Sequence, residues 1–511
     1  MSDPTGPADA PRDRAKAFDP HILDHSVIAR PLLDDLARRG DAALVDIVID
    51  LNLGFHGGRE RAKERVRDLV AAALAASGGK PDGAGVDERK TELSDQYVFA
   101  RLSGAAIRAL VRLDDESARS GAERVIHRVW PDFEVRALLT HSVSTVKADA
   151  ALTSFAASGD GIVWAVLDSG VDGTHPHFTK HATLQLAAPL RHRDFTCGPG
   201  QPESPLTDDF GHGTHVAGII AGELTAADLG PRDGETKPAR IVAVSRHRDE
   251  SDKVVQDVVE LDEIRGIAPE CRIVSMKVLD KDGRGQVSNL ITALEDVLRV
   301  NGYGKDIRIH GVNLSVGYDF DPEWFACGQS PLCNVVDRLV RSGVVVVVAA
   351  GNTGYGYTDT VQRGSVLAGL TLSINDPGNA ERAITVGSTH RDMPHVYGVS
   401  YFSSKGPTGD GRPKPDLVAP GEKILSCGAG SRLLKAKATT QEALYIEDSG
   451  TSMAAPHVSG AIAAFLSIRR EFIGQAEEVK RIFVSSATDL RRERYFQGAG
   501  LVDVMRAIQS V

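Results

Sequence analysis

Four segments of the chain are apolar at nearly every position, and this pattern restricts the possible folds more than any other feature. They lie at residues 162–170, 272–280, 307–316 and 344–352, and each is followed by helical or loop sequence. A strand with one wet face alternates apolar and polar residues, whereas a strand of a parallel sheet is covered on both faces and is apolar throughout. We therefore predict an α/β domain in which a mostly parallel sheet carries helices on both faces.

The chain before residue 146 has a different pattern. Residues 1–40 are polar and proline-rich, as in a flexible tail, and residues 44–53 alternate like a half-buried strand. The next segments read in turn as helix, strand, helix and strand, at residues 59–77, 97–104, 105–113 and 125–139. We expect a small α+β domain of ferredoxin-like arrangement over residues 41–145, with two helices on one face of its sheet. The larger domain then occupies residues 146–511.

Two segments interrupt the larger domain. Residues 223–263 are predicted to be an insertion with its own hairpin, rich in carboxylates. Calcium binding and a solvated acidic hairpin both fit this composition, and no DxDxDG loop is present to favour calcium. Residues 354–378 are expected to be irregular and to help shape a groove.

Composition limits the partners of the chain. With 59 basic and 69 acidic residues the net charge is −10, and no Lys/Arg run is long enough to follow a phosphate backbone, so we expect no nucleic-acid partner. The first twenty residues contain no apolar core of a signal peptide, and no run of about 18 apolar residues occurs. We expect a cytoplasmic protein that does not enter membranes, with export by another route left open.

The five cysteines include no CxxC pair, which argues against a zinc site and against a disulfide framework. Cys327 and Cys333 are close in sequence. A local bridge and two free thiols both remain open.

The segment at residues 450–456, GTSMAAP, places a serine where a glycine-freed bend opens a helix. Unpaired N–H groups at a helix start can hold the negative charge that develops when an alcohol attacks a carbonyl. Pro456 fits this interpretation because its ring is tolerated near a helix beginning. Ser452 is therefore a candidate nucleophile, and the alternative is a serine that only caps a core helix.

A serine nucleophile needs a base and an acid that orients the base. His212 stands between glycines in DDFGHGTHVAG, and Asp168 ends the first buried segment in VLDSGVDG. Two other interpretations are weighed: Asp168 can cap a turn, and His212 with His215 can form an HxxH metal pair. The metal pair lacks a third ligand motif and leaves the glycines and the serine motif unexplained.

Taken together, these motifs resemble the subtilisin family of serine endopeptidases. The resemblance spans roughly residues 145–511 and rests on VLDSGVD, HGTHVAG, KVLDKDGRGQ, VNLSVG, VVAAGN and GTSMAAPHVSG, in the order that the family has. It implies that Asp168 orients the base His212 and that Ser452 attacks the substrate. It also implies that Asn352, otherwise an ordinary loop residue, completes the oxyanion hole with the Ser452 N–H, and that no cofactor is needed, calcium being at most a structural ion.

The resemblance further suggests how a peptide would bind. The expected edges of the groove are small-residue segments, and the pocket before the scissile bond is expected to have a small lining: Gly283, Arg284 and Gly285; Ser315, Val316 and Gly317; Ala349, Ala350 and Gly351. Such a lining predicts broad cleavage after apolar or aromatic residues. Arg284 stands where a smaller residue is usual and is predicted to favour acidic groups upstream.

The N-terminal domain resembles the family's propeptide, an intramolecular chaperone and inhibitor. We predict self-cleavage between about residues 137 and 149 of the zymogen. Two alternatives use the same site: a peptide ligase or macrocyclase that passes the acyl-enzyme to an amine, and a regulatory binding protein whose groove stays blocked.

Overall fold

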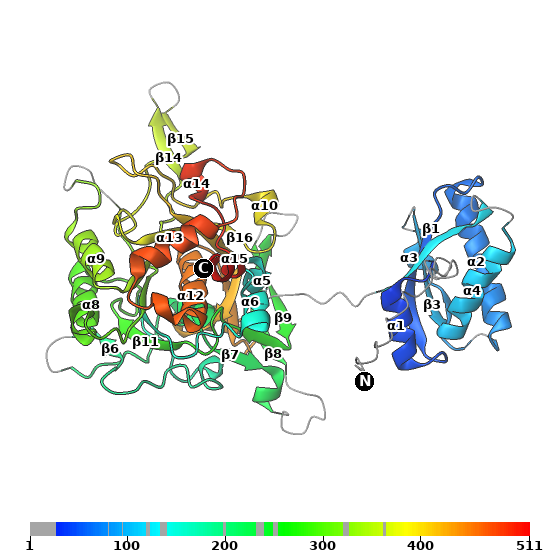
Figure 1. The fold of residues 1–511 in the computed structure, drawn as a ribbon, viewed down its shortest axis with the longest axis horizontal. Coiled ribbons are helices and arrows are strands. Elements are labelled where there is room, and N and C mark those ends of the chain that lie inside the picture. The colour runs from blue at the N-terminus through cyan, green and yellow to red at the C-terminus, as the bar shows by residue number, and fades with distance from the viewer. Residues whose placement is uncertain are drawn as a thin grey trace, which may run out of the picture. The chain divides into compact units, whose positions relative to one another are not determined.

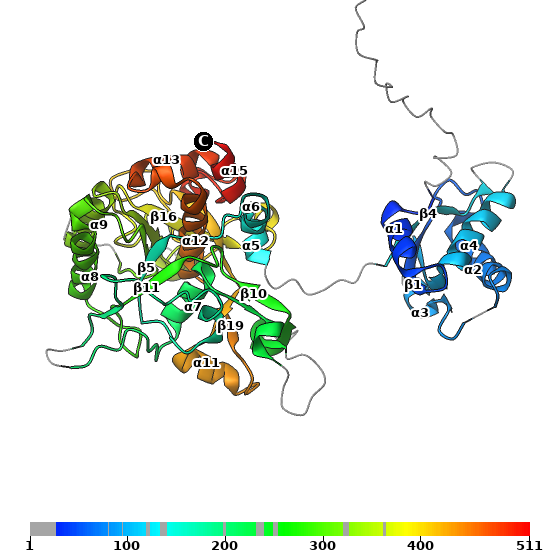
Figure 2. The ribbon, with the colours of Figure 1, turned by 60° about the horizontal axis from the view of Figure 1, so that its bottom comes forward.

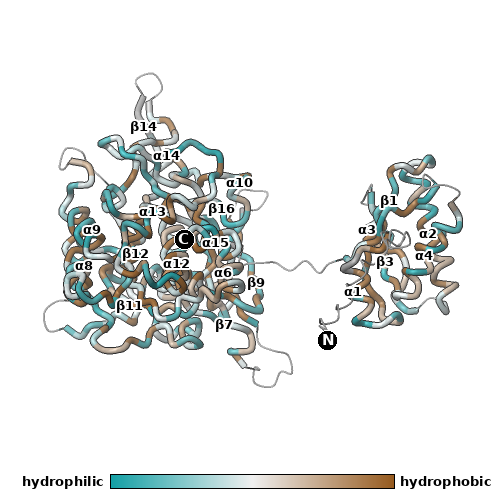
Figure 3. The backbone as a smooth tube through the Cα atoms, viewed as in Figure 1, coloured by the Kyte–Doolittle hydropathy of each residue, from teal (hydrophilic) through white to brown (hydrophobic). Residues whose placement is uncertain are grey.

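The structure, a computed structural model, divides the chain into two compact units, Met1–Ala137 and Leu138–Val511 (Figure 1). It describes residues 27–79, 81–92, 94, 96–118, 123–132, 141–197, 201–230, 240–248, 254–319, 326–360 and 364–511. Apolar stretches run through the interior of each unit, as the colouring by hydropathy in Figure 3 shows.

The first unit is a four-stranded antiparallel sheet with the strand order β2-β3-β1-β4. Its elements in chain order are α1 (Arg30–Arg39), β1 (Leu44–Leu51), α2 (Gly58–Ala76), β2 (Gly85–Val86), α3 (Glu88–Glu92), β3 (Tyr97–Ser103), α4 (Gly104–Glu116) and β4 (Ile126–Pro131). Helices α2 and α4 pack against each other and against the sheet through one apolar core. This is the ferredoxin-like arrangement. The strand β2, at one edge of the sheet, has only two residues.

The alternation predicted for the first strand is present in β1. Val45, Ile47, Ile49 and Leu51 are buried, while the residues between them are at least partly exposed. Side chains on a strand point to opposite faces in turn, so one face of β1 closes the core and the other contacts solvent.

The predicted tail and domain boundary need correction. Helix α1 lies within the segment assigned to the tail, yet Leu32 and Leu36 are buried in the core of the first unit. Residues 1–26 lie outside the described part. The second unit begins before residue 146, because Val143 of helix α5 (His141–Thr145) belongs to its core.

The second unit is built on a seven-stranded parallel sheet. Its strands in spatial order are β17 (Leu417–Glu422), β16 (Ile384–His390), β13 (Val345–Ala349), β12 (Gly311–Leu314), β5 (Val163–Asp168), β11 (Arg272–Lys277) and β6 (Arg193–Asp194). Every residue of β12 and β13 is buried. The four predicted strands are all present in this sheet, and the α/β class with helices on both faces is confirmed.

Helices surround this sheet. They are α5, α6 (Ala148–Phe155), α7 (His212–Ile220), α8 (Val287–Val300), α9 (Pro331–Arg341), α10 (Pro394–Tyr397), α11 (Gly430–Lys437), α12 (Thr451–Ile468), α13 (Ala476–Ser486), α14 (Arg494–Gln497) and α15 (Val504–Gln509), with 3₁₀ turns η4 (Pro176–Phe178), η5 (Ala226–Leu229), η6 (Gly302–Gly304) and η7 (Arg470–Phe472). Helix α12 contacts five of the strands and also α7, near the middle of the unit (Figure 2). By length and composition α12 resembles a membrane span, but 83% of it is buried, so its apolar surface belongs to the core.

The insertion contains the predicted hairpin. Strands β8 (Ile241–Arg248) and β9 (Val254–Leu261) pair antiparallel, and β18 (Ile424–Cys427) and β19 (Tyr445–Asp448) extend them to a four-stranded sheet. A two-stranded sheet of β7 (Glu223–Thr225) and β10 (Glu263–Arg265) closes the insertion. Residues 231–239 and 249–253 of this insertion lie outside the described part.

The segment at residues 354–378, expected to be irregular, holds a hairpin of β14 (Tyr355–Thr360) and β15 (Gly364–Gly369). All five cysteines are free, so Cys327 and Cys333 are not bridged.

Candidate active site

Each residue proposed for the chemistry lies at the end of a regular element. Asp168 is the last residue of β5, His212 the first of α7, and Ser452 the second of α12, while Asn352 follows β13. The carboxyl ends of parallel strands meet at one edge of a sheet. These residues, which are far apart in the sequence, are therefore brought to the same edge.

Asp168 and His212 form a buried pair. Nδ1–H of His212 donates to both carboxylate oxygens of Asp168, at 2.7 and 2.9 Å. Asp168 is 1% exposed and His212 8%. Burial lowers the pKa of His212, but the charge and the hydrogen bond of Asp168 outweigh burial, so this pKa lies above 6.5. The bond also fixes the tautomer, because a proton on Nδ1 leaves Nε2 as the basic nitrogen.

A second carboxylate fixes the turn that carries His212. Asp208 is buried and accepts hydrogen bonds from the N–H of Gly211, from the hydroxyl of Ser169, and from both the N–H and the hydroxyl of Thr214, at 2.6–2.8 Å. Burial raises the pKa of Asp208 although these bonds act against it. Sequence reasoning missed Asp208, although its place in the DDFGHGTH motif was visible.

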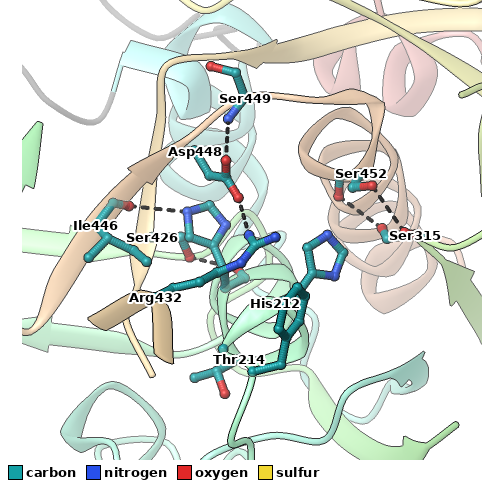
Figure 4. A network of polar contacts seen from close by, with 12 residues as sticks. His212, Thr214, Ser315, Ser426, Arg432, Ile446, Asp448, Ser449 and Ser452 are labelled. Carbon is teal, nitrogen blue, oxygen red and sulfur yellow. Dashed lines mark hydrogen bonds and ion pairs between the residues drawn. The ribbon is translucent and has the colours of Figure 1, made fainter. Parts of the chain in front are cut away.

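Ser452 and Ser315 exchange hydrogen bonds. The Ser452 hydroxyl donates to the carbonyl of Ser315 at 3.0 Å, and the Ser315 hydroxyl donates to the carbonyl of Ser452 at 2.9 Å (Figure 4). The buried amide of Asn313 in turn donates to Ser315 Oγ at 2.8 Å. A hydroxyl has one proton, so in this arrangement Ser452 does not donate to His212. A rotation about its Cα–Cβ bond is needed for that contact.

Asn352 is held by the residue before the serine. Its Oδ1 accepts from the N–H and the hydroxyl of Thr451, at 2.9 and 3.1 Å. Because Oδ1 accepts these two bonds, the orientation of the amide is fixed, and Nδ2 is its donor group.

One groove brings these residues together. It is lined by Phe210, His212, Leu279, Gly283, Arg284, Gly285, Gln286, Val287, Leu290, Ser315, Val316, Gly317, Tyr318, Ala349, Gly351, Asn352, Thr353, Asn375, Arg432, Thr451 and Ser452. All predicted substrate-binding residues except Ala350 are among them. Six lining residues lie outside the quoted motifs: Val287, Leu290, Tyr318, Thr353, Asn375 and Arg432.

Ala350 is not a lining residue. It is fully buried, its N–H donates to Val386, and its carbonyl accepts from Asn375. Successive residues of an extended segment face opposite sides, so Ala350 faces away from the groove that Ala349 and Gly351 line. The prediction for Ala350 was wrong for this reason.

The alternative metal pair is not assembled. Nε2 of His215 contacts the carbonyl of Ile446 at 3.1 Å, and burial lowers the pKa of His215 to about 4. His212 is turned to Asp168 instead. Within the described part of the chain, no group of three or more His, Cys, Asp or Glu side chains could hold a metal ion. For the acidic hairpin, calcium binding and a solvated hairpin without an ion both stay open.

Comparison with known proteins identifies the class that this fold and site define. The model of the subtilase family matches residues 159–501. The serine protease AprX of Bacillus subtilis is 28% identical over 399 residues, covering 75% of this chain and 74% of AprX. Subtilisin E of the same species is 28% identical over 428 residues, covering 83% of this chain and 85% of subtilisin E.

The chain belongs to the subtilase family. It is a serine endopeptidase that acts on proteins or peptides.

Proposed function

We propose that Ser452 is the nucleophile of this endopeptidase, that His212 is its general base, and that Asp168 orients the imidazole. The observation that carries the proposal is the Asp168–His212 pair beside a groove that Ser452 and Asn352 also line. Among the described residues, the ring of His212 forms its hydrogen bonds through Nδ1, which leaves Nε2 as the basic nitrogen. Ser452 stands at a helix start, where N–H groups lack helical partners.

The chemistry follows from these positions. Ser452 Oγ turns from the Ser315 carbonyl toward Nε2 of His212, gives up its proton to Nε2, and attacks the scissile carbonyl. The oxyanion that forms is held by the N–H of Ser452 and by Nδ2 of Asn352. His212 then passes the proton to the leaving amine, and an ester remains on Ser452. Water, deprotonated by His212, releases the acid product.

Reaction with a fluorophosphonate tests this assignment. The probe should label Ser452, located by peptide mapping, and Ser452→Ala should abolish the labelling. Ser467→Ala is the matched control: its hydroxyl, on the same helix, donates to the carbonyl of Ala464 and accepts from the N–H of Gly159, and the variant should label like the parent. Labelling that survives Ser452→Ala would exclude Ser452 as the nucleophile. Product masses that exceed the substrate by one water separate hydrolysis from peptide ligation.

The groove supports broad cleavage after apolar or aromatic residues. Ala349 and Gly351 leave space beside Ser452, and the segments at residues 283–285 and 315–317 can pair with an extended peptide through their backbones. Sequencing the products of an unfolded protein substrate checks this. A strict preference for a basic or acidic residue before the cut would contradict it.

The first unit is proposed to act as an inhibitor and folding aid that the enzyme itself removes. Residues 137–140 of the predicted cleavage region lie outside the described part, and its remaining residues, 141–149, include α5 and the start of α6. On incubation, the intact protein should lose the first unit, with a new N-terminus between about residues 137 and 149. Ser452→Ala should keep it, and loss of the unit from this variant in isolation would contradict self-cleavage. Cytoplasmic location also stays a prediction, to be checked by cell fractionation.

A further inference from the structure

Helix α11 is fixed to the turn that carries His212. The N–H of Ser431 donates to the carbonyl of Asp209 at 2.8 Å, and the Ser431 hydroxyl donates to the carbonyl of Phe210 at 3.3 Å. Gly430 has a φ of +51°, and a Cβ there would come within 2.2 Å of the Asp209 oxygen. The start of α11 therefore sits tightly against this turn.

This contact brings Arg432 into the groove. Its guanidinium carbon lies 4.8 Å from the centre of the Phe210 ring, and that ring is 6.4 Å from the imidazole of His212. Arg432 also forms an ion pair with Asp448, whose other oxygen accepts from the N–H of Ser449 at 2.9 Å (Figure 4). The ring and the carboxylate hold the guanidinium in place. Because a guanidinium has five N–H donors, donors remain for a second carboxylate.

The charge of the groove contrasts with that of the chain. Among the described residues that line it, Arg284 and Arg432 are basic and none is Asp or Glu, whereas the whole chain has a net charge of −10. Arg284 is exposed, and among the described residues its guanidinium forms no ion pair. A cleft of one charge sign attracts ligands of the opposite sign.

We propose that Arg432 is a specificity residue that selects a substrate with a carboxylate side chain within two residues of the scissile bond. The proposal deepens the function assigned above and rests on Ser452 and His212 being the reacting groups. Arg284 comes from a different segment of the lining, residues 283–285, and is expected to act on a different substrate position. Arg432 is 25% exposed on its side chain, so the preference is moderate.

Quenched fluorescent peptides with one aromatic residue before the cut provide the test. Glu and Gln are compared at each of the three positions that precede this aromatic residue and at the two positions after the bond, and kcat/KM is measured for each pair. We expect Glu to be favoured about two- to fivefold at one position within two residues of the bond, the range for a partly exposed ion pair. Arg432→Gln should bring this ratio to about one, and Arg432→Lys should keep part of it. Using the ratio within each variant removes any general change in rate.

Three controls distinguish a direct contact between Arg432 and the substrate from a general effect of positive charge. Lys435→Gln removes the same charge from an exposed position of α11 outside the groove lining, and it should leave the ratio unchanged. Arg284→Gln should change the ratio at a different position only. Arg432→Gln combined with Asp448→Asn keeps the local charge balance and should still lose the preference.

Two outcomes overturn the proposal. If the all-Gln peptide is cleaved but Arg432→Gln changes no Glu/Gln ratio, or if Lys435→Gln changes it as much, Arg432 is not a specificity residue although the enzyme assignment stands. If no peptide is cleaved and the fluorophosphonate fails to label Ser452, both the site assignment and this proposal fail.

Discussion

Each end of the parallel sheet in the second unit carries a buried cluster of charged residues. At the carboxyl end, Asp168 binds His212 next to the groove. At the amino ends of β16 and β17, the Asp416 carboxylate accepts from Lys414 at 2.6 Å and from Lys480 at 3.0 Å. Lys414 also donates to the carbonyl of Ala383 at 2.8 Å.

The two clusters differ in what their polar atoms contact. Burial lowers the pKa of Lys414 to about 7 even though Asp416 opposes this shift. Both clusters thus contain a perturbed pKa, but the three donors of Lys414 are all used inside the protein, on Asp416, Ala383 and Thr385. At the other end, Nε2 of His212 and the amide of Asn352 face a groove. A shifted pKa alone does not indicate a reactive site. A reactive site also needs a polar atom that a ligand in a groove can reach.

The largest expected effect comes from the carboxyl end. Asp168→Asn should lower kcat about ten-thousandfold, because asparagine cannot hold the imidazole in the tautomer that leaves Nε2 basic. Steady-state kinetics on a peptide substrate measure this. A loss smaller than about tenfold would mean that the contact does not orient the base, and the distinction between the two ends would fail.

The amino end should respond in stability instead. Asp416→Asn leaves Lys414 and Lys480 without a counter-charge, which should lower the free energy of unfolding by about 3–5 kcal/mol. Denaturant titration in a Ser452→Ala background avoids self-digestion. Asp306→Asn, which breaks the exposed pair with Arg308, is the control and should cost at most about 1 kcal/mol. If Asp416→Asn instead lowers kcat/KM of the folded enzyme, this cluster serves catalysis and the comparison is wrong.

The oxyanion position gives the next effect in size. Asn352→Ala should reduce kcat about a hundred- to a thousandfold with little change in KM, a magnitude known for the oxyanion asparagine of this family. Thr451→Val removes one of the two bonds to Asn352 Oδ1 and should have a smaller effect in the same direction. A variant that changes KM alone would assign Asn352 to binding.

The sequence predicted the carboxyl end far better than the amino end. Asp168, His212, Ser452 and Asn352 lie in short motifs, where glycines and fixed spacing carry the information. Lys414 and Asp416 lie in no motif, because a buried ion pair requires only two side chains of opposite charge that the fold brings together.

Other omissions have local causes. Helix α11 is short and has no side-chain cap, so residues 430–437 carry no sequence signal that predicts the position of Arg432 in the groove. Helix α1 was not predicted, because the composition of residues 1–40 is polar and proline-rich. In both cases the tertiary contact, rather than local propensity, determines the structure.

The smallest effect concerns pH and tests the different environments of two histidines on α7. His212 must be neutral to act as a base, so kcat/KM should fall as the pH drops through a pKa above 6.5, the direction that Asp168 imposes. Asp168→Asn removes the main influence that opposes burial, so the pKa of His212 should fall and the acid limb of the residual activity should move to lower pH. His215→Gln should leave the limb in place, because burial keeps His215 neutral down to about pH 4. The same raised pKa makes His212 stabilise the fold below pH 6.5, and this contribution is lost as the pH rises through its folded pKa. An acid limb that moves with His215→Gln and not with Asp168→Asn would reverse the roles given to the two histidines.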